Sequence, residues 1–111
     1  MAKAPPSAKR ERIKNFVPAL VDYTNDVIYG DLWERKGLSK RDRSLITVAA
    51  LIATYRPEQL VSHLTRAINH GVTQEEITEV ITHMAFYAGW PAAMSAAQIA
   101  YTVLVEGKKD D

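Results

Sequence analysis

Residues Ser62–Ile77 read "SHLTRAINHGVTQEEI", a stretch that contains the end of one helix and the beginning of the next. Gly71 is of the residue type that most often ends a helix. Thr73 and Glu76 have the spacing of a capping box, in which each side chain accepts a hydrogen bond from the other residue's backbone N–H. The stretch therefore predicts two helices joined by a short corner, with two histidines in the first of them.

Helical patterns continue on both sides of this corner. Pro57 is suited to the first turn of the preceding helix, whose apolar residues recur at steps of three and four. After the corner, one helix is expected to end at Gly89, and a last helix is expected from Pro91 to Gly107. No hairpin signal or glycine-rich phosphate loop interrupts this pattern.

The first half of the chain adds two more helices. An amphipathic helix is expected from Glu11 to Gly30, with Pro18 near its start; its apolar stripe comprises Ile13, Phe16, Val17, Leu20, Val21, Thr24, Val27 and Ile28. Ser39 is expected to cap the next helix, whose run "LITVAALIA" is apolar on every side and is therefore expected to be buried on every side.

All five glycines lie at or between the predicted element ends, and this agreement supports an all-α chain of about five helices. The predicted organisation is a single domain: a flexible N-terminal arm at 1–10, the helical domain at 11–107 and a charged tail at 108–111.

Composition argues against several classes of function. The 14 Lys and Arg residues are balanced by 13 Asp and Glu, whereas nucleic-acid-binding proteins usually have a basic surplus. With no cysteine, the chain has no disulfide, thiolate nucleophile or thiolate metal ligand. It shows no signal peptide, and its apolar runs are far shorter than the ~20 residues of a membrane span. We therefore expect a cytoplasmic protein with neither a nucleic-acid nor a membrane partner.

Small residues are concentrated in the last helix, where they would allow another helix to approach closely. They are Ala92, Ala93, Ser95, Ala96, Ala97 and Ala100. The apolar run of the second helix also needs more cover than a five-helix monomer offers. Together these features predict a homo-oligomer.

Histidines are the first candidates for chemistry. His63 borders an apolar stripe, so it is either a buried, hydrogen-bonded ring or a proton donor, since a histidine titrates near pH 6.5. His70 precedes Gly71 and is interpreted as a cap of the helix C-terminus. About 10.5 Å of helix rise separates the two histidines, too far for one shared ion, and no metal site is expected.

The remaining candidates are basic and aromatic. Arg43 precedes the apolar run and is placed either to hold a carboxylate through two hydrogen bonds or to form a salt bridge. Arg41 is expected to be solvated. Trp33 and Tyr87 are interpreted as core or interface aromatics, and the position of His83 on the next helix leaves its neighbours open.

Three segments, "LWERKGL", "RSLITVAALIA" and "HLTRAINHGVTQEEITEVITHMAFYAGWPAA", together resemble the carboxymuconolactone decarboxylase family, whose fold is shared with the alkylhydroperoxidase D proteins. The likeness extends from about Phe16 to Leu104. It implies an all-helical subunit in a ring-like homo-oligomer, a trimer or a hexamer built as a trimer of dimers. The peroxidase branch carries Cys-x-x-Cys where Arg56 and Gln59 stand here, so the decarboxylase branch is implied, as it also is by Ser44.

For that branch the resemblance implies cofactor-independent removal of carbon dioxide from a small carboxylated lactone or related organic acid, as in the degradation of aromatic compounds. Arg43 would hold an anion, Ser44 would donate a hydrogen bond to the developing oxyanion, and His63 would return a proton to carbon. Trp33, His83 and Tyr87 would contact the substrate. Neither a metal nor an organic cofactor is implied.

Several positions depart from the decarboxylase pattern. Thr65 stands where an arginine often follows the histidine, and the neighbouring Arg66 is expected to face elsewhere. Met94 and Gln98 replace an asparagine and a histidine. Two alternatives therefore stay open: a ligand-binding or structural oligomer of the same fold without redox chemistry, and a helical regulator or adaptor.

Overall fold

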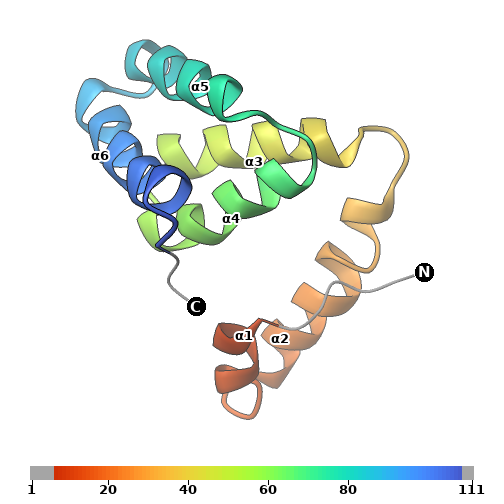
Figure 1. The fold of residues 1–111 in the computed structure, drawn as a ribbon. Helices are drawn as coiled ribbons and strands as arrows, with labels where there is room; N and C mark the ends of the chain where they lie inside the picture. Colours follow the sequence, from red (N-terminus) through yellow and green to blue (C-terminus); the bar gives the residue numbers. More distant parts are fainter. Residues whose placement is uncertain (1–6, 109–111) are drawn as a thin grey trace. The chain divides into compact units, whose positions relative to one another are not determined.

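The computed structural model describes residues 7–108, and all regular secondary structure within this range is helical (Figure 1). The chain divides between Lys40 and Arg41 into two compact units. The all-helical prediction is confirmed for the described residues. None of the helices in this range is long and apolar enough to cross a membrane.

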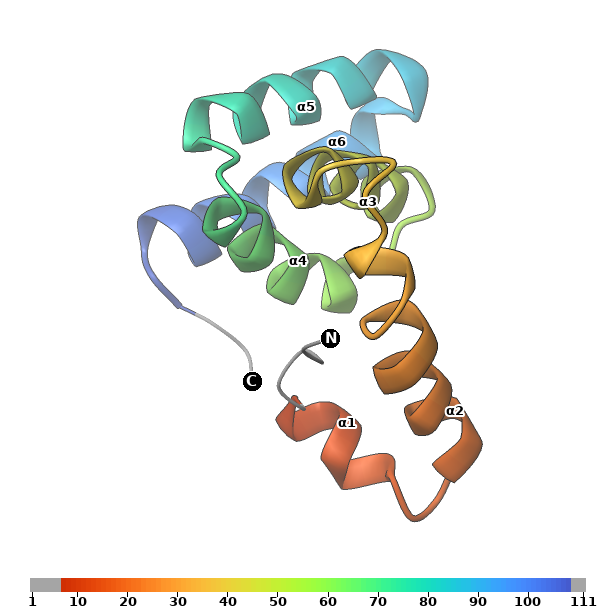
Figure 2. The same ribbon diagram turned by 90° about the vertical axis from the view of Figure 1, so that its right-hand side faces the viewer.

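The first unit contains two short helices, α1 (Ala8–Ile13) and α2 (Pro18–Tyr23), which lie side by side in Figures 1 and 2. A π-helical turn, Thr24–Ile28, continues α2, and a 3₁₀ turn, Leu32–Glu34, follows. The helix expected from Glu11 to Gly30 is therefore divided in two, and its main part begins at Pro18, as the expected place of the proline near the helix start allows. Proline lacks a backbone N–H and its ring clashes with a preceding helical turn, so Pro18 begins a new helix at its first turn.

The N-terminal boundary also differs from the expectation. Helix α1 begins at Ala8, inside the predicted arm, because the Ser7 hydroxyl accepts a hydrogen bond from the Arg10 N–H at 3.0 Å. The rest of the predicted arm, 1–6, and most of the predicted tail, 109–111, lie outside the described residues.

The predicted apolar stripe of this unit is mostly exposed. Val21 is buried, but the Phe16 side chain is 85% exposed and Leu20 is 60% exposed. Aromatic contacts form instead around Tyr29, whose ring centre lies 6.2 Å from that of Trp33 and 5.1 Å from the Arg10 guanidinium. Trp33 is itself buried, so it is an aromatic packing residue of the structure.

The second unit is built from α3 (Lys40–Ala53, which begins at the boundary residue), α4 (Pro57–Asn69), α5 (Gln74–Tyr87) and α6 (Trp90–Ala100), followed by a π-helical turn, Tyr101–Val105. In Figure 1, α3 and α4 run in opposite directions and are joined by a tight corner. All four helices contribute to one core, made of Val48, Ile52, Leu60, Leu64, Ala67, Val72, Ile77, Ile81, Ala93, Ala96, Ala100 and Val103.

Within the described part of one chain, helix α3 is not buried on every side, and burial of its other side would require the homo-oligomer that the sequence predicts. Val48 and Ile52 face the core, whereas Ile46 on another side of the helix is 56% exposed. The small residues of the last helix were predicted to allow another helix to approach closely. Two of them, Ala93 and Ala96, are buried in the core of this chain. Packing within this chain therefore covers one side of α3 and leaves an apolar side uncovered.

The corner between α4 and α5 has the predicted capping box. The Thr73 hydroxyl accepts from the Glu76 N–H at 3.1 Å, and the Glu76 carboxylate accepts from the Thr73 N–H at 2.9 Å. Gly71 has φ of 98°, in the left-handed region that a glycine adopts without strain. The corner is thus fixed by local hydrogen bonds and by one glycine.

Removing this cap is expected to destabilise the fold measurably. Thr73→Ala should lower the free energy of unfolding by about 1 kcal/mol, because the Glu76 N–H loses its acceptor. This corresponds to a fall in Tm of about 4–8 °C. Thr82→Ala is the matched control on the same helix: its exposed hydroxyl bonds only a carbonyl of the preceding turn, and its effect should stay within about 0.5 kcal/mol. Equal effects in calorimetry would contradict the role of the cap.

Candidate functional site

Three basic side chains share one face at the C-terminal half of α4. His63, Arg66 and His70 follow one another at steps of three and four residues, which places them along one side of a helix. All three are half-buried, and His70 is the residue that ends the helix. This face therefore presents cationic and proton-exchanging groups that are partly shielded from water.

The first turns of α3 meet this face. Ser44 is buried, with only 2% of its surface exposed, and its Oγ lies 2.8 Å from Nδ1 of His70. Arg43 precedes it in α3, is half-buried, and has a buried Nε atom. The contact between Ser44 and His70 brings the beginning of α3 and the end of α4 together.

A second contact fixes the same region. The Arg41 guanidinium forms an ion pair with the Glu76 carboxylate in the first turn of α5. The Thr73 backbone N–H, and then the Arg41 guanidinium, lower the pKa of Glu76 below its ordinary value. The expectation that Arg41 is solvated was therefore wrong, because the α4–α5 corner brings an acidic partner to it.

The pKa of His63 is shifted by its burial and by the neighbouring charges on α4. Burial is the largest cause that lowers the pKa of His63, and the charges of Arg66 and His70 lower it further, to about 4. His63 is consequently neutral at neutral pH. Arg66 lies one turn from His63 on the same helix, close enough for its charge to act on the imidazole. A site with this charge distribution favours an anionic ligand.

The other sequence candidates, Trp33, His83 and Tyr87, lie on other elements of the chain. The rings of His83 and Tyr87 stack on α5 with centres 4.6 Å apart, and the Tyr87 side chain is 78% exposed. His83 also lines an open hollow of about 320 Å³ with Ala49, Glu79, Val80 and Met84. Trp33 belongs to the first unit, whereas the others belong to the second.

The side chains of His63, Arg66 and His70 on α4 form a cluster, and two of them, Arg66 and His70, were not expected as site residues from the sequence. His70 was interpreted only as a helix cap, and Arg66 was discounted. The spacing of seven residues between His63 and His70 already placed both on one helix face. His70 is the residue at the C-terminal cap of α4, as expected. Its side chain also contacts Ser44, which is 26 positions away in the sequence, and no local pattern indicates that contact.

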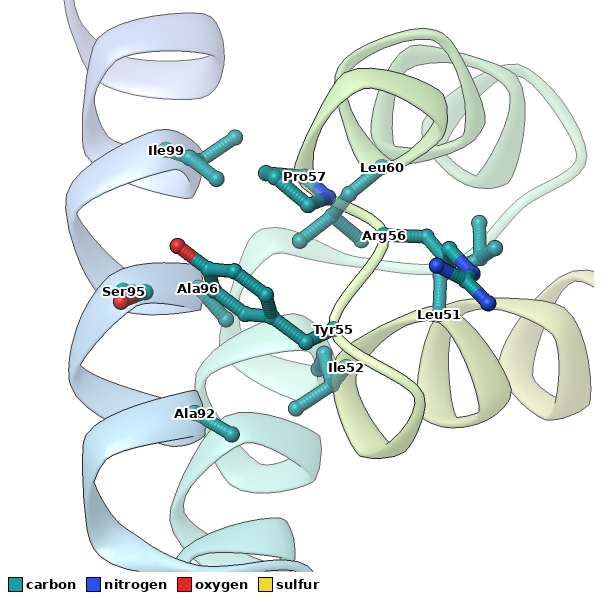
Figure 3. Close-up of a pocket in the computed structure, with 10 residues that line it drawn as sticks. All are labelled: Leu51, Ile52, Tyr55, Arg56, Pro57, Leu60, Ala92, Ser95, Ala96 and Ile99. Carbon is teal, nitrogen blue, oxygen red and sulfur yellow. The ribbon is translucent and has the colours of Figure 1, made fainter.

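The two positions that the resemblance equates with the peroxidase thiols, Arg56 and Gln59, are exposed in the structure. Figure 3 shows Tyr55 extending towards α6, while the Arg56 side chain points away from α6. The hollow at this corner, lined also by Leu51, Ala96 and Ile99, measures about 10 Å³. That volume is about enough for one water molecule.

Comparisons with known proteins show a family and several related sequences. The model of the carboxymuconolactone decarboxylase family matches residues 18–102. The chain is 37% identical over 93 residues to the 4-carboxymuconolactone decarboxylase of Acinetobacter baylyi, and the aligned part spans 84% of this chain and 69% of that protein. It is 40% identical over 68 residues to the nitrosuccinic acid decarboxylase of Metarhizium robertsii, covering 61% and 48% of the two chains. An uncharacterized 15.0 kDa protein of Paracoccus denitrificans is 29% identical over 96 residues, covering 85% of this chain and 72% of that one.

Proposed function

The chain belongs to the carboxymuconolactone decarboxylase family, and from that membership we propose that it is a cofactor-independent decarboxylase of a small carboxylated lactone or related organic acid. Support comes from two relatives with decarboxylase names, whose sequences are 37% and 40% identical to this chain over the aligned residues. The observation that carries the proposal is the half-buried cluster of cationic and imidazole groups around His63.

The two named acids have a common chemistry. Both 4-carboxymuconolactone and nitrosuccinic acid are dicarboxylic acids in which one carboxylate is attached next to an electron-withdrawing group. When carbon dioxide leaves, the electrons of the broken C–C bond delocalise onto oxygen, through the ring double bond to the lactone carbonyl or directly onto the nitro group. The substrate itself therefore accepts the electron pair, and the protein must bind the anion, stabilise the developing charge and return one proton to carbon.

The described residues can divide these tasks. Arg43 and Arg66 are proposed to hold the carboxylates, because a guanidinium offers two parallel hydrogen bonds to such a group. Burial, and then the charges of Arg66 and His70, lower the pKa of His63. A bound dianion is proposed to raise this pKa by its opposite charge, which favours uptake of a proton by His63 when the substrate is present. The protonated ring then donates to the carbanion and is recharged from water. Trp33, His83 and Tyr87 stay candidates for contact with the substrate.

Release of carbon dioxide tests the proposal directly. Purified protein treated with a chelator is expected to release one carbon dioxide per molecule of 4-carboxymuconolactone or of nitrosuccinic acid. Succinic acid, which has two carboxylates but no activating group, is the control and should not react. If neither activated acid is consumed, the decarboxylase proposal fails. Binding of these acids in calorimetry without release of carbon dioxide would favour the ligand-binding alternative.

We further propose that the protein acts as a homo-oligomer, a trimer or hexamer. The support is the number of large apolar side chains that packing within the described part of the chain leaves exposed, among them Phe16, Leu20, Ile46, Phe86, Tyr87, Trp90 and Met94. Light scattering at micromolar concentration is expected to give at least three times the mass of one chain. A monomer at that concentration would contradict the proposal.

A further inference from the structure

We propose that His70, rather than Ser44, is the side chain that meets the substrate, and that Ser44 is a positioning residue that holds His70 as the Nε2–H tautomer. This reverses the role expected for Ser44 from the sequence. The inference rests on the decarboxylase function proposed above, since it assigns a further substrate-contacting group to the same site.

Ser44 and His70 differ in how much of their surface is exposed. Ser44 is only 2% exposed, so its hydroxyl has almost no surface to offer a ligand. His70 is half-buried at the end of α4, on the same helix face as His63 and Arg66. Of the two hydrogen-bonded partners, His70 is therefore the one that a ligand can reach.

The direction of the hydrogen bond follows from the needs of a buried hydroxyl. Its proton must find an acceptor, because burying an unsatisfied polar group is costly. Among the described residues, the partner recorded for the Ser44 Oγ atom is Nδ1 of His70, at 2.8 Å. Ser44 therefore donates and Nδ1 accepts. A neutral imidazole that accepts at Nδ1 carries its hydrogen on Nε2.

This tautomer suits the proposed reaction. An Nε2–H group in a half-buried site can donate to a substrate carboxylate or to the oxygen that gains charge as carbon dioxide leaves. A charge on His70 lowers the pKa of His63. Holding His70 as a neutral donor therefore adds a hydrogen bond to the anion without opposing the protonation of His63.

Imidazole nitrogen chemical shifts test the tautomer without any substrate. In uniformly ¹⁵N-labelled protein, His70 is expected to show a hydrogen on Nε2 and an accepting Nδ1, and Ser44→Ala should change it to a mixture of tautomers. Thr47→Ala is the matched control on α3, because the Thr47 hydroxyl bonds the Arg43 carbonyl at 2.8 Å rather than a histidine. A hydrogen on Nδ1 in the wild type, or a tautomer unaffected by Ser44→Ala, would overturn the proposal.

Turnover of 4-carboxymuconolactone tests which residue meets the substrate. His70→Leu is expected to lower kcat by about 10²–10³-fold through loss of a hydrogen-bond donor. Ser44→Ala removes only the hydrogen bond that holds the His70 ring in one tautomer, so it should lower kcat about tenfold. The double variant should be no slower than His70→Leu alone, because Ser44 acts through His70. His70→Gln, whose amide N–H can stand in for Nε2–H, should recover part of the rate.

The two experiments separate the inference from the function on which it rests. A double variant about tenfold slower than His70→Leu would show that Ser44 acts on the substrate by itself, and the proposal would fail. If the wild type shows no turnover, the proposed function fails, while the nitrogen shifts of the wild type and Ser44→Ala still decide the tautomer. The nitrogen shifts of the wild type and of Ser44→Ala do not depend on whether His70→Leu folds.

Discussion

Replacement of His63 by glutamine is expected to lower kcat for decarboxylation by about 10²–10⁴-fold, the range of a general acid that is lost from a reaction. Glutamine keeps a hydrogen-bonding side chain of similar size but cannot give a proton to a carbanion. The effect should appear in kcat more than in KM, because Arg43 and Arg66 still hold the anion. Steady-state release of carbon dioxide from 4-carboxymuconolactone measures it.

Ser62→Ala is the matched control for this variant. Ser62 is the neighbouring residue on α4, it is exposed, and its hydroxyl bonds the Gln59 carbonyl at 3.2 Å. Its turnover should equal that of the wild type. If His63→Gln keeps the wild-type rate with an unchanged Tm, His63 does not deliver the proton, and the mechanism proposed for the cluster is wrong.

The second large effect concerns stability and pH. The pKa of His63 is about 4 in the folded chain and 6.5 when the ring is free in solution, so the unfolded state takes up this proton first as the pH falls. The stability that the neutral ring contributes is therefore complete above pH 6.5 and is lost between pH 6.5 and about 4. The shift corresponds to a loss of up to about 3 kcal/mol in the free energy of unfolding.

Urea denaturation at pH 7 and pH 4 measures this loss. His63→Gln removes the titrating ring and keeps His70, His83 and all acidic groups, so the difference between the variants isolates His63. The wild type should lose up to about 3 kcal/mol more than His63→Gln between the two pH values. Identical losses would show that the surroundings of His63 do not lower its pKa.

Local signals predicted most of the helices of the second unit. Pro57, Gly71, Gly89 and the Thr73–Glu76 box lie where the helices begin and end, because proline, glycine and capping side chains act on the backbone within one turn. The helix expected from Glu11 is divided in two although its apolar period is continuous across Pro18. The periodicity of side chains does not show where a backbone breaks.

Burial was predicted less well than helicity. The run 45–53 is apolar on all sides, yet Ile46 is exposed, because one chain supplies neighbours for one side of α3. Composition shows that a surface is apolar and does not show which molecule covers it. The same limit applies to Phe16 and Leu20 in the first unit.

The candidate site was predicted only in part, for a related reason. His63 was a candidate from its residue type and from its place beside an apolar stripe. Its electrostatic neighbours Arg66 and His70 lie on the same helix face. The contacts that join this face to other helices required the tertiary structure, since Ser44 meets His70 across 26 positions and Arg41 meets Glu76 across 35. Such pairs depend on how helices meet, which the spacing within one helix does not encode.

The central claim is that binding of an anion makes His63 a proton donor, and the pKa of His63 measured by NMR titration tests it most directly. Succinate is a suitable probe because it carries two carboxylates and does not lose carbon dioxide. We expect the pKa of His63 to be about 4 in the free protein and to rise by about 1–3 units when succinate is bound. A pKa of His63 that is the same with and without bound succinate would contradict it.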